Sequence, residues 1–350
     1  MTEQLKRVEQ PSEDAFCGQQ LELFQNILAN TADERDRISH TIDLWDAIPK
    51  YYVSRAQQNK LRSKDGTLRT ITKEFQYGRK TFKVRIRPAR LTDKDGNEKE
   101  FYPSAREELV EDALRKIAAE QGYGFMESDK KGISRTGVIF SLYMLRQELN
   151  RRSHSITYYD IIESLLILKR THIEIYAEDT GYFECPIFLE LGSVSRQEWL
   201  ENPKARWVVH FNSIVTSSIE AVTFRQYDYH TMMTHKYQLS RWFHKRLSHN
   251  YRNAHYTCPY TIRYSTIMRD SRLLENYETR FGVREVDKSL KELKEHHVLM
   301  NFKKEVIYGV RKKIQDVKYI LTPSVKFIAQ MKAANERHRR DRQLLEAAAK

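Results

Sequence analysis

The segment from Thr279 to His296 constrains the fold of this chain more than any other. At about 100° per residue, its apolar side chains fall in one narrow sector and its basic side chains in a neighbouring sector. The apolar residues are Val283, Val286, Leu290 and Leu293, and the basic residues are Arg280, Arg284, Lys288, Lys291 and Lys294. The pattern predicts a helix with one buried face, beside a face that is either simply solvated or placed to meet negative charge.

The residues around this helix predict a compact unit that ends in a basic hairpin. A short helix is expected from Ser265, before the two-faced helix. After it, the apolar segments Val298–Met300 and Val317–Leu321 are typical of two strands joined by a basic loop. The basic residues of that loop are Arg311, Lys312 and Lys313. This order is that of a winged helix, in which one helix can enter the major groove of DNA while a cationic wing lies over the phosphates.

The basic charge of the chain is concentrated in its last third. The formal net charge of the 350 residues is +13. Residues Arg225 to Lys350 contain 27 Lys and Arg against 13 Asp and Glu, a net charge of +14. Residues Met1 to Phe224 contain 33 against 34, a net charge of −1. This asymmetry favours nucleic acid, and less strongly an anionic membrane surface, as the partner of the last third.

Composition sets aside several other classes of protein. No run of about 18 apolar residues occurs, and Met1–Gln10 is polar and charged. We therefore expect no membrane span, no secretory signal and a cytoplasmic protein. Cys17, Cys185 and Cys258 are odd in number and far apart, which matches neither a disulfide framework nor the paired spacing of a zinc site.

The first half of the chain carries helices and a hairpin of its own. Ser104 and Glu107 form a capping box that opens a helix ending at Gly122. Apolar spacing predicts a second helix over Val138–Leu149, and Thr157 caps a third that runs to Arg170. The strands predicted in this half are His172–Ala177, Tyr182–Leu191 and Trp207–Val215.

The second half repeats this plan, with a long helix over Thr234–Asn253 and a closing helix from Ser324. The predicted fold class is α+β: two tandem winged-helix domains, helix-rich and each with a small antiparallel β-hairpin wing, after a small N-terminal α/β extension. The extension, residues 1–100, contains a short helix near Leu21–Leu28 and a hairpin with a turn at Asp95 and Gly96. The first winged-helix domain is assigned to residues 101–217, the second to 218–342 and a tail to 343–350, with a linker near Ser217–His230.

Four runs of residues resemble the C-terminal half of plasmid replication initiator proteins. They are Ser218–Glu220, Phe224–Tyr229, Leu239–Lys245 and Ile262–Ser271, and the resemblance extends over about Arg135 to Ala334. This family consists of tandem winged-helix proteins that bind short repeats at a plasmid origin. The resemblance implies binding of double-stranded DNA by both winged domains and a homodimer in equilibrium with monomer, formed through the first domain. It also implies recruitment of the host initiator and the replicative helicase.

The first domain departs from this family pattern at its hairpin. Residues His172 to Leu191 contain no Lys or Arg, and the hairpin carries the acidic residues Glu174, Glu178, Asp179 and Glu184. An acidic hairpin is a poor contact for phosphates, so we expect the first domain to contact protein more than DNA.

The candidate DNA-binding residues form two groups. The candidates for the groove-facing side are Arg280, Arg284, Lys288 and Lys291. Arginine suits this role because it can grip guanine O6 and N7 with two hydrogen bonds. The candidates for phosphate contacts are Arg263, Arg269 and Arg272, in and before the short helix, and Arg311, Lys312 and Lys313 at the wing. The basic run Arg337–Arg342 is either a solvated helix end or a further DNA contact.

The sequence predicts no active site, no cofactor and no metal. Gly132–Gly137 has the spacing of a phosphate loop, but Val138 stands where the lysine is required. A rolling-circle initiator, with a tyrosine nucleophile and two histidines one residue apart, is the enzymatic alternative, yet none of the 12 histidines has that spacing. We expect His235 and His296 to be packing or surface residues. A winged-helix transcriptional repressor would use the same recognition helix, and this alternative stays open.

Overall fold

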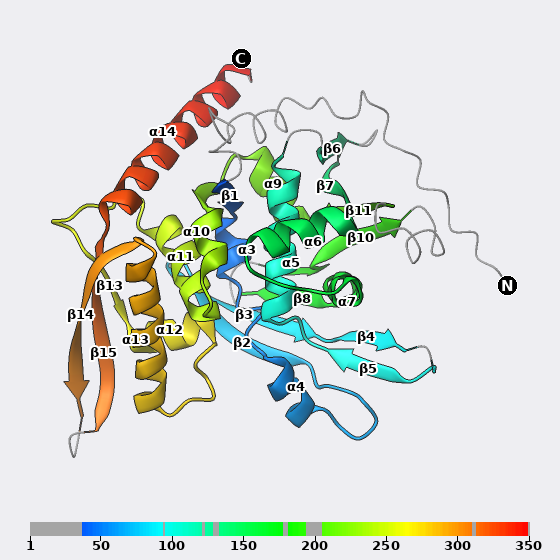
Figure 1. Cartoon of the computed structure of the whole chain (residues 1–350), viewed down its shortest axis with the longest axis horizontal. Helices are drawn as coiled ribbons and strands as arrows, with labels where there is room; N and C mark the ends of the chain where they lie inside the picture. Colours follow the sequence, from blue (N-terminus) through cyan, green and yellow to red (C-terminus); the bar gives the residue numbers. More distant parts are fainter. Residues whose placement is uncertain are drawn as a thin grey trace.

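Two hydrophobic cores organise the protein. Figure 1 shows how its helices and strands are arranged. The computed structural model describes residues 37–93, 95–120, 123–128, 133–177, 181–193, 205–309 and 313–348. Within them, the first core takes its buried side chains from Ile42 to Met233, and the second takes them from Leu239 to Met331. The chain therefore passes from one core to the other between Met233 and Leu239. The helix expected near Leu21–Leu28 lies outside the described residues.

The residues before 101 contribute to the first core. Their elements are β1 (Ile38–Thr41), α3 (Asp43–Ala47), α4 (Arg55–Leu61), β2 (Ile71–Tyr77), β3 (Lys80–Arg87), β4 (Ala89–Thr92) and β5 (Glu98–Phe101). Trp45 of α3 is completely buried, and β3 buries Val84 and Ile86 on one face, as its alternating pattern predicts. β4 and β5 form the hairpin expected at Asp95 and Gly96, where the Asp93 carboxylate accepts the backbone N–H of Asp95 (2.9 Å).

The first domain continues with helices, two of which begin where the sequence predicts. Its elements are α5 (Ala105–Ala118), β6 (Gly124–Ser128), β7 (Ser134–Ser141), α6 (Leu142–Arg151), α7 (Tyr158–Arg170), β8 (His172–Tyr176), β9 (Tyr182–Pro186), β10 (Phe188–Ser193), β11 (Arg206–Phe211) and α9 (Ser213–Glu220). Before α5, Glu107 accepts the backbone N–H of Ser104 (2.8 Å). Before α7, Thr157 Oγ1 accepts the backbone N–H of Asp160 (3.1 Å), so both predicted N-caps are confirmed.

Two predicted boundaries in this domain are wrong. Val138 lies in β7 and not in a helix, since α6 begins only after Ser141, whose Oγ accepts the backbone N–H of Met144 (3.1 Å). Val138 is a buried residue of β7, which pairs with β11. Its spacing to the apolar residues of α6 happens to match the period of a helix, which explains the wrong prediction. The strand expected over Trp207–Val215 ends at Phe211, because Asn212 caps α9 by accepting the backbone N–H of Ile214 (3.1 Å).

The segment expected as a linker, Ser217–His230, is buried structure instead. Within it, all four residues of β12 (Arg225–Asp228) are buried, and β12 pairs antiparallel with β1. The short helix α10 (Tyr229–Thr234) follows directly and buries Met232 and Met233 in the first core. A composition-based linker prediction fails here because the partner strand comes from the other end of the described chain.

The acidic hairpin of the first domain is part of a larger sheet rather than a free wing. β8 pairs with β3, which gives a four-stranded sheet of order β2-β3-β8-β9. The basic side of β3 then meets the acidic side of the hairpin: Arg85 pairs with Glu174 (2.8 Å), and Arg87 pairs with Glu174 and with Glu184 (3.3 Å). These internal pairs account for Glu174 and Glu184, whereas Glu178 and Asp179 lie outside the described residues. A second four-stranded sheet has the order β10-β11-β7-β6.

The second domain has the predicted winged-helix order. Its elements are α11 (Gln238–Asn250), β13 (Tyr260–Arg263), α12 (Tyr264–Ser271), α13 (Thr279–Glu295), β14 (Leu299–Tyr308), β15 (Ile314–Pro323) and α14 (Val325–Ala348). The three strands form one antiparallel sheet of order β13-β15-β14. α14 packs Phe327 and Met331 into the second core and then projects away from the body of the protein (Figure 1).

Candidate nucleic-acid interface

The buried side of α13 anchors it in the second core. Val283, Val286, Leu290 and Leu293 are all buried there, as the sequence predicts. Gly282 lets α12 and α13 approach, because a Cβ atom at this position would lie 2.0 Å from the hydroxyl oxygen of Tyr264. This anchoring leaves the opposite side of α13 in solvent with a fixed orientation.

The exposed side of α13 carries the predicted cations. Arg280, Arg284, Lys288 and Lys291 are all exposed. Lys288 donates to Glu285 (2.6 Å), and this hydrogen bond raises the pKa of Lys288. Arg280 and Arg284 lie over the ring of Phe281, at 5.4 and 5.6 Å from its centroid, and Phe281 is itself 43% exposed. Within the described parts of the chain, Arg280, Arg284 and Lys291 have no ion-pair partner, so their charges are available to a ligand.

The hairpin β14–β15 is fixed against this helix. Lys304 of β14 pairs with Asp287 of α13, and Lys318 pairs across the strands with Glu305 (3.1 Å). Lys303 and Lys313 are exposed, and neither pairs with an acidic residue in the described ranges. Arg311 and Lys312 lie outside the described residues. The wing therefore carries at least two available cations, of which Lys303 lies on the face of β14 opposite to Lys304 and α13.

The three arginines near the short helix differ in their surroundings. Arg263 is exposed at the end of β13. Arg269 pairs with the neighbouring Asp270 (2.7 Å) and is 38% exposed. Arg272, in the left-handed region at φ 58°, pairs with Glu275 (3.1 Å) and donates to the backbone carbonyl of Glu74 (2.5 Å). The Arg272 guanidinium is therefore already engaged in contacts, one of which joins the second domain to β2.

Sequence reasoning missed two contributors to this surface. Phe281 was not singled out, although an exposed aromatic residue between two arginines is a recognisable signal. Lys303 was also missed, although the adjacent pair Lys303 and Lys304 lies in a strand whose exposed side can be read from the sequence. The basic run on α14 is partly engaged, because Arg337 donates to Gln226 of β12 (3.0 Å).

A buried ionic cluster joins the two domains behind this surface. Lys245 of α11 donates to Asp112 (2.5 Å) and to Glu108 (3.3 Å), both of α5. Arg115 of α5 continues the cluster to Asp46 (2.8 Å). Burial alone would raise the pKa of Asp46, but Arg115 and Lys245 hold it well below its usual range. The carboxylate is therefore charged at neutral pH, and the cluster fixes α11 against α5.

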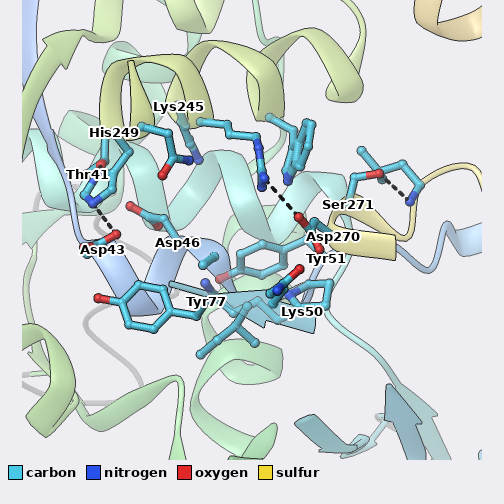
Figure 2. Close-up of a pocket in the computed structure, with 18 of the residues that line it drawn as sticks. Thr41, Asp43, Asp46, Lys50, Tyr51, Tyr77, Lys245, His249, Asp270 and Ser271 are labelled. Carbon is cyan, nitrogen blue, oxygen red and sulfur yellow. Dashed lines mark hydrogen bonds and ion pairs between the residues drawn. The ribbon is translucent and has the colours of Figure 1, made fainter. Parts of the chain in front are cut away.

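A cavity of about 640 Å³ lies beside this cluster, between the two domains (Figure 2). Side chains of both signs line it, and several pair with one another: Arg246 with Asp270 (3.0 Å), and His249 with Asp43 and with Thr41 Oγ1 (2.7 Å). The charges that line the cavity therefore largely compensate one another, and the cavity favours neither an anionic nor a cationic ligand.

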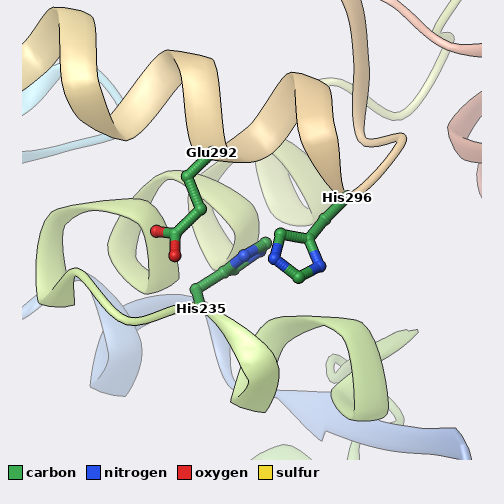
Figure 3. A group of neighbouring side chains, drawn as sticks. All are labelled: His235, Glu292 and His296. Atoms are coloured by element: carbon green, nitrogen blue, oxygen red, sulfur yellow. The ribbon is translucent and has the colours of Figure 1, made fainter.

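Three side chains with donor atoms for a metal ion lie close together: His235, Glu292 and His296 (Figure 3). Glu292 comes from the buried side of α13, and His296 follows directly at its C-terminal end. Glu292 and His296 are four residues apart on α13, a spacing that the sequence analysis did not weigh. Separately, within the parts of the chain that the structure describes, no helix is both long enough and apolar enough to cross a membrane.

No protein-family model matches the chain, and no curated protein matches it significantly. Solved structures do match. A selenomethionine derivative of domains 2 and 3 of RctB is 9% identical with a TM-score of 0.49, covering 80% of this chain and 99% of that one. Another structure of RctB domains 2–3 is 9% identical with a TM-score of 0.45, covering 79% and 98%. Pi initiator protein in complex with iteron DNA is 11% identical with a TM-score of 0.41, covering 63% and 94%.

Proposed function

We propose that this chain is a sequence-specific DNA-binding protein that initiates plasmid replication by binding repeats at the origin. The observation that carries the proposal is the row of exposed cations on α13, Arg280, Arg284 and Lys291, on a helix whose other side is locked in the second core. The adjacent hairpin adds Lys303 on its outer face and Lys313 directly before β15. The arrangement matches a winged helix that reads duplex DNA.

In this proposal α13 enters the major groove with its first turns nearest the bases. Arg280 and Arg284 lie in those turns, where helix-turn-helix proteins place their base contacts. The ring of Phe281 supports both guanidinium groups and limits their freedom before binding. Lys291, Lys303 and Lys313 contact phosphates, which sets the register and makes the affinity fall with salt.

The first domain serves protein contact in this proposal. Residues Met1 to Phe224 have a net charge of −1, and Arg85 and Arg87 of β3 are occupied by Glu174 and Glu184. We propose that this domain supports a homodimer in equilibrium with monomer, and that the bound protein recruits the host initiator and the replicative helicase. A transcriptional repressor would share the reading helix and differ in the DNA it occupies.

Footprinting of the full chain on DNA flanking its own gene tests the proposal. We expect protection of directly repeated short sites beside an A·T-rich stretch, whereas protection of a lone inverted repeat would favour the repressor. Arg284→Ala should lose the footprint at concentrations where the wild type protects. Arg206→Ala removes the same charge from an exposed site in the first domain and should leave the footprint intact. Equal footprints for Arg284→Ala and wild type would mean that α13 does not read the DNA.

A further inference from the structure

Three potential metal ligands meet where the chain crosses from the first core to the second. His235 lies in the crossing segment, directly after α10, and Glu292 and His296 are one turn apart in the last turns of α13. Figure 3 shows the Glu292 carboxylate and the His296 ring hanging from α13 toward His235. One ligand atom from each residue lies within 4.8 Å of those of the other two.

His235 is the buried member of this group, and one of its nitrogens has no protein partner. Its side chain is 0% exposed. Its Nε2 shares a hydrogen bond with Nδ1 of His244 (3.0 Å), while its Nδ1 is buried and meets no hydrogen-bond partner among the described residues. A buried ring nitrogen without a hydrogen-bond partner is a candidate metal ligand.

The other two side chains are held in place by second contacts. The Glu292 carboxylate accepts the backbone N–H of Lys236 (2.7 Å) and of Tyr237 (3.3 Å), and its remaining lone pairs stay available. Nδ1 of His296 lies 3.3 Å from Thr234 Oγ1, and its ring stands edge-on to His235 at 5.0 Å. Ligands of protein-bound metals are oriented by outer contacts of this kind.

We propose that His235, Glu292 and His296 bind a divalent transition-metal ion, with Zn²⁺ the best match. Two imidazoles and one carboxylate suit Zn²⁺ and not the all-oxygen preferences of Ca²⁺ or Mg²⁺. Ligand distances of about 2.0–2.2 Å require the three donors to close in by small side-chain rotations, and water takes the fourth place. His244 becomes the outer partner that orients His235.

A metal at this site ties the C-terminal end of α13 to the segment that joins the two cores. It would fix the angle of α13 relative to the first domain, which neither core alone determines. The inference rests on the side chains themselves, and it stands whether or not α13 reads DNA.

The test uses the full chain without an affinity tag, stripped with a chelator and titrated with Zn²⁺ by calorimetry. We expect one equivalent to bind, and His296→Gln to weaken the affinity by roughly 100-fold or more, since loss of an outer partner alone costs about 10–100-fold. His297→Asn is the matched control: His297 is the exposed neighbour at φ 57°, a conformation that asparagine tolerates. It should bind like the wild type.

Two further measurements guard against a folding defect and a different site. Zn²⁺ should raise the Tm of the wild type and of His297→Asn but not that of His296→Gln, whose far-ultraviolet circular dichroism should match the wild type. Co²⁺ should give the visible bands of a tetrahedral nitrogen and oxygen site. Absence of stoichiometric Zn²⁺ binding, equal affinity in His296→Gln, or a thiolate-to-cobalt band from Cys258 would each overturn the proposal.

Discussion

Lys245 of α11 places its ammonium 2.5 Å from a carboxylate oxygen of Asp112 on α5, across the boundary between the two cores. Both side chains are almost completely buried. Burial alone would lower the pKa of Lys245, but Asp112 and Glu108 raise it above its usual value, so the ammonium keeps its charge. The pair is therefore a fixed link between the domains rather than a surface ion pair.

Lys245→Met should strongly destabilise the protein. The change removes the nearer of the two cations beside buried Asp112 and leaves Arg115 (2.8 Å), which costs up to about 3–5 kcal/mol in the free energy of unfolding. Urea unfolding at neutral pH measures this cost. Lys294→Met, an exposed change on α13, should shift the free energy of unfolding by less than about 0.5 kcal/mol. Similar small effects for both variants would show that the buried pair is solvated.

Arg284 and Lys303 should contribute to DNA binding in different ways. Arg284→Ala should cost about 1–3 kcal/mol on a cognate repeat and relax the preference at one base pair, because it removes a base contact. Lys303→Ala should weaken cognate and scrambled duplexes alike and reduce the salt slope by about one unit, because it removes a phosphate contact. Titrations on both duplexes at two salt concentrations separate the outcomes. Equal, sequence-independent losses would place a different element in the groove.

Gly282→Ala should disrupt the packing of α12 on α13. The added methyl group would overlap the Tyr264 hydroxyl, and overpacking of this kind costs about 1–3 kcal/mol. Tyr264→Phe should be mild alone, because that hydroxyl is buried and has no hydrogen-bond partner among the described residues. A double-mutant cycle by thermal unfolding should show that Tyr264→Phe recovers part of the loss. Strict additivity would contradict the predicted contact.

The free energy of unfolding should fall with acidification through His235 and His244. Burial lowers the pKa of His235 to about 2 and that of His244 to about 4, whereas histidine in an unfolded chain titrates near pH 6.5. Below about pH 6.5 the unfolded state therefore binds more protons, and stability is lost as the pH falls toward the folded pKa values. Each histidine contributes up to about 1.4 kcal/mol per pH unit.

Urea unfolding across this pH range, with a chelator present, measures the slope. His244→Asn should reduce the slope, since it removes one of the buried histidines, which also include His40 with a pKa lowered to about 3. His297→Asn should not change it, because His297 is exposed in the folded protein. An unaltered slope in His244→Asn would show that this histidine is already protonated or solvated when folded.

The sequence was sufficient for α13 and the strands after it because their contacts are local, whereas the helix predicted over Thr234–Asn253 is interrupted between α10 and α11 and β13 was not predicted. The 3.6-residue period of Val283 to Leu293 encodes the buried side of α13 directly, and the strands that follow are adjacent in the chain. The exposed cations of the candidate interface follow from the same period. The period could not reveal which cations are engaged within the protein. Arg272 is an example, since it contacts the backbone carbonyl of Glu74 and the carboxylate of Glu275.

The first domain was harder to predict because its partners are remote in sequence. From the sequence, the acidic side of β8 was interpreted as a surface for a partner protein. In the structure, Glu174 of β8 pairs with Arg85 of β3, which is 89 residues earlier in the chain. β12 looked like a linker because its partner β1 precedes it by most of the domain. Local periodicity carries no information about pairings of this length.

The pairing of β1 with β12 also sets an order of events during synthesis. Arg37 and Asp228, which pair at this junction, are 191 residues apart, so the first core cannot close until about two-thirds of the chain has left the ribosome. The winged helix that follows assembles from consecutive residues and needs no such wait. The last helix, α14, then lies against the same strand, where Gln330 donates to Asp228 (2.7 Å). β12 thus contacts both the first strand and the last helix of the described chain.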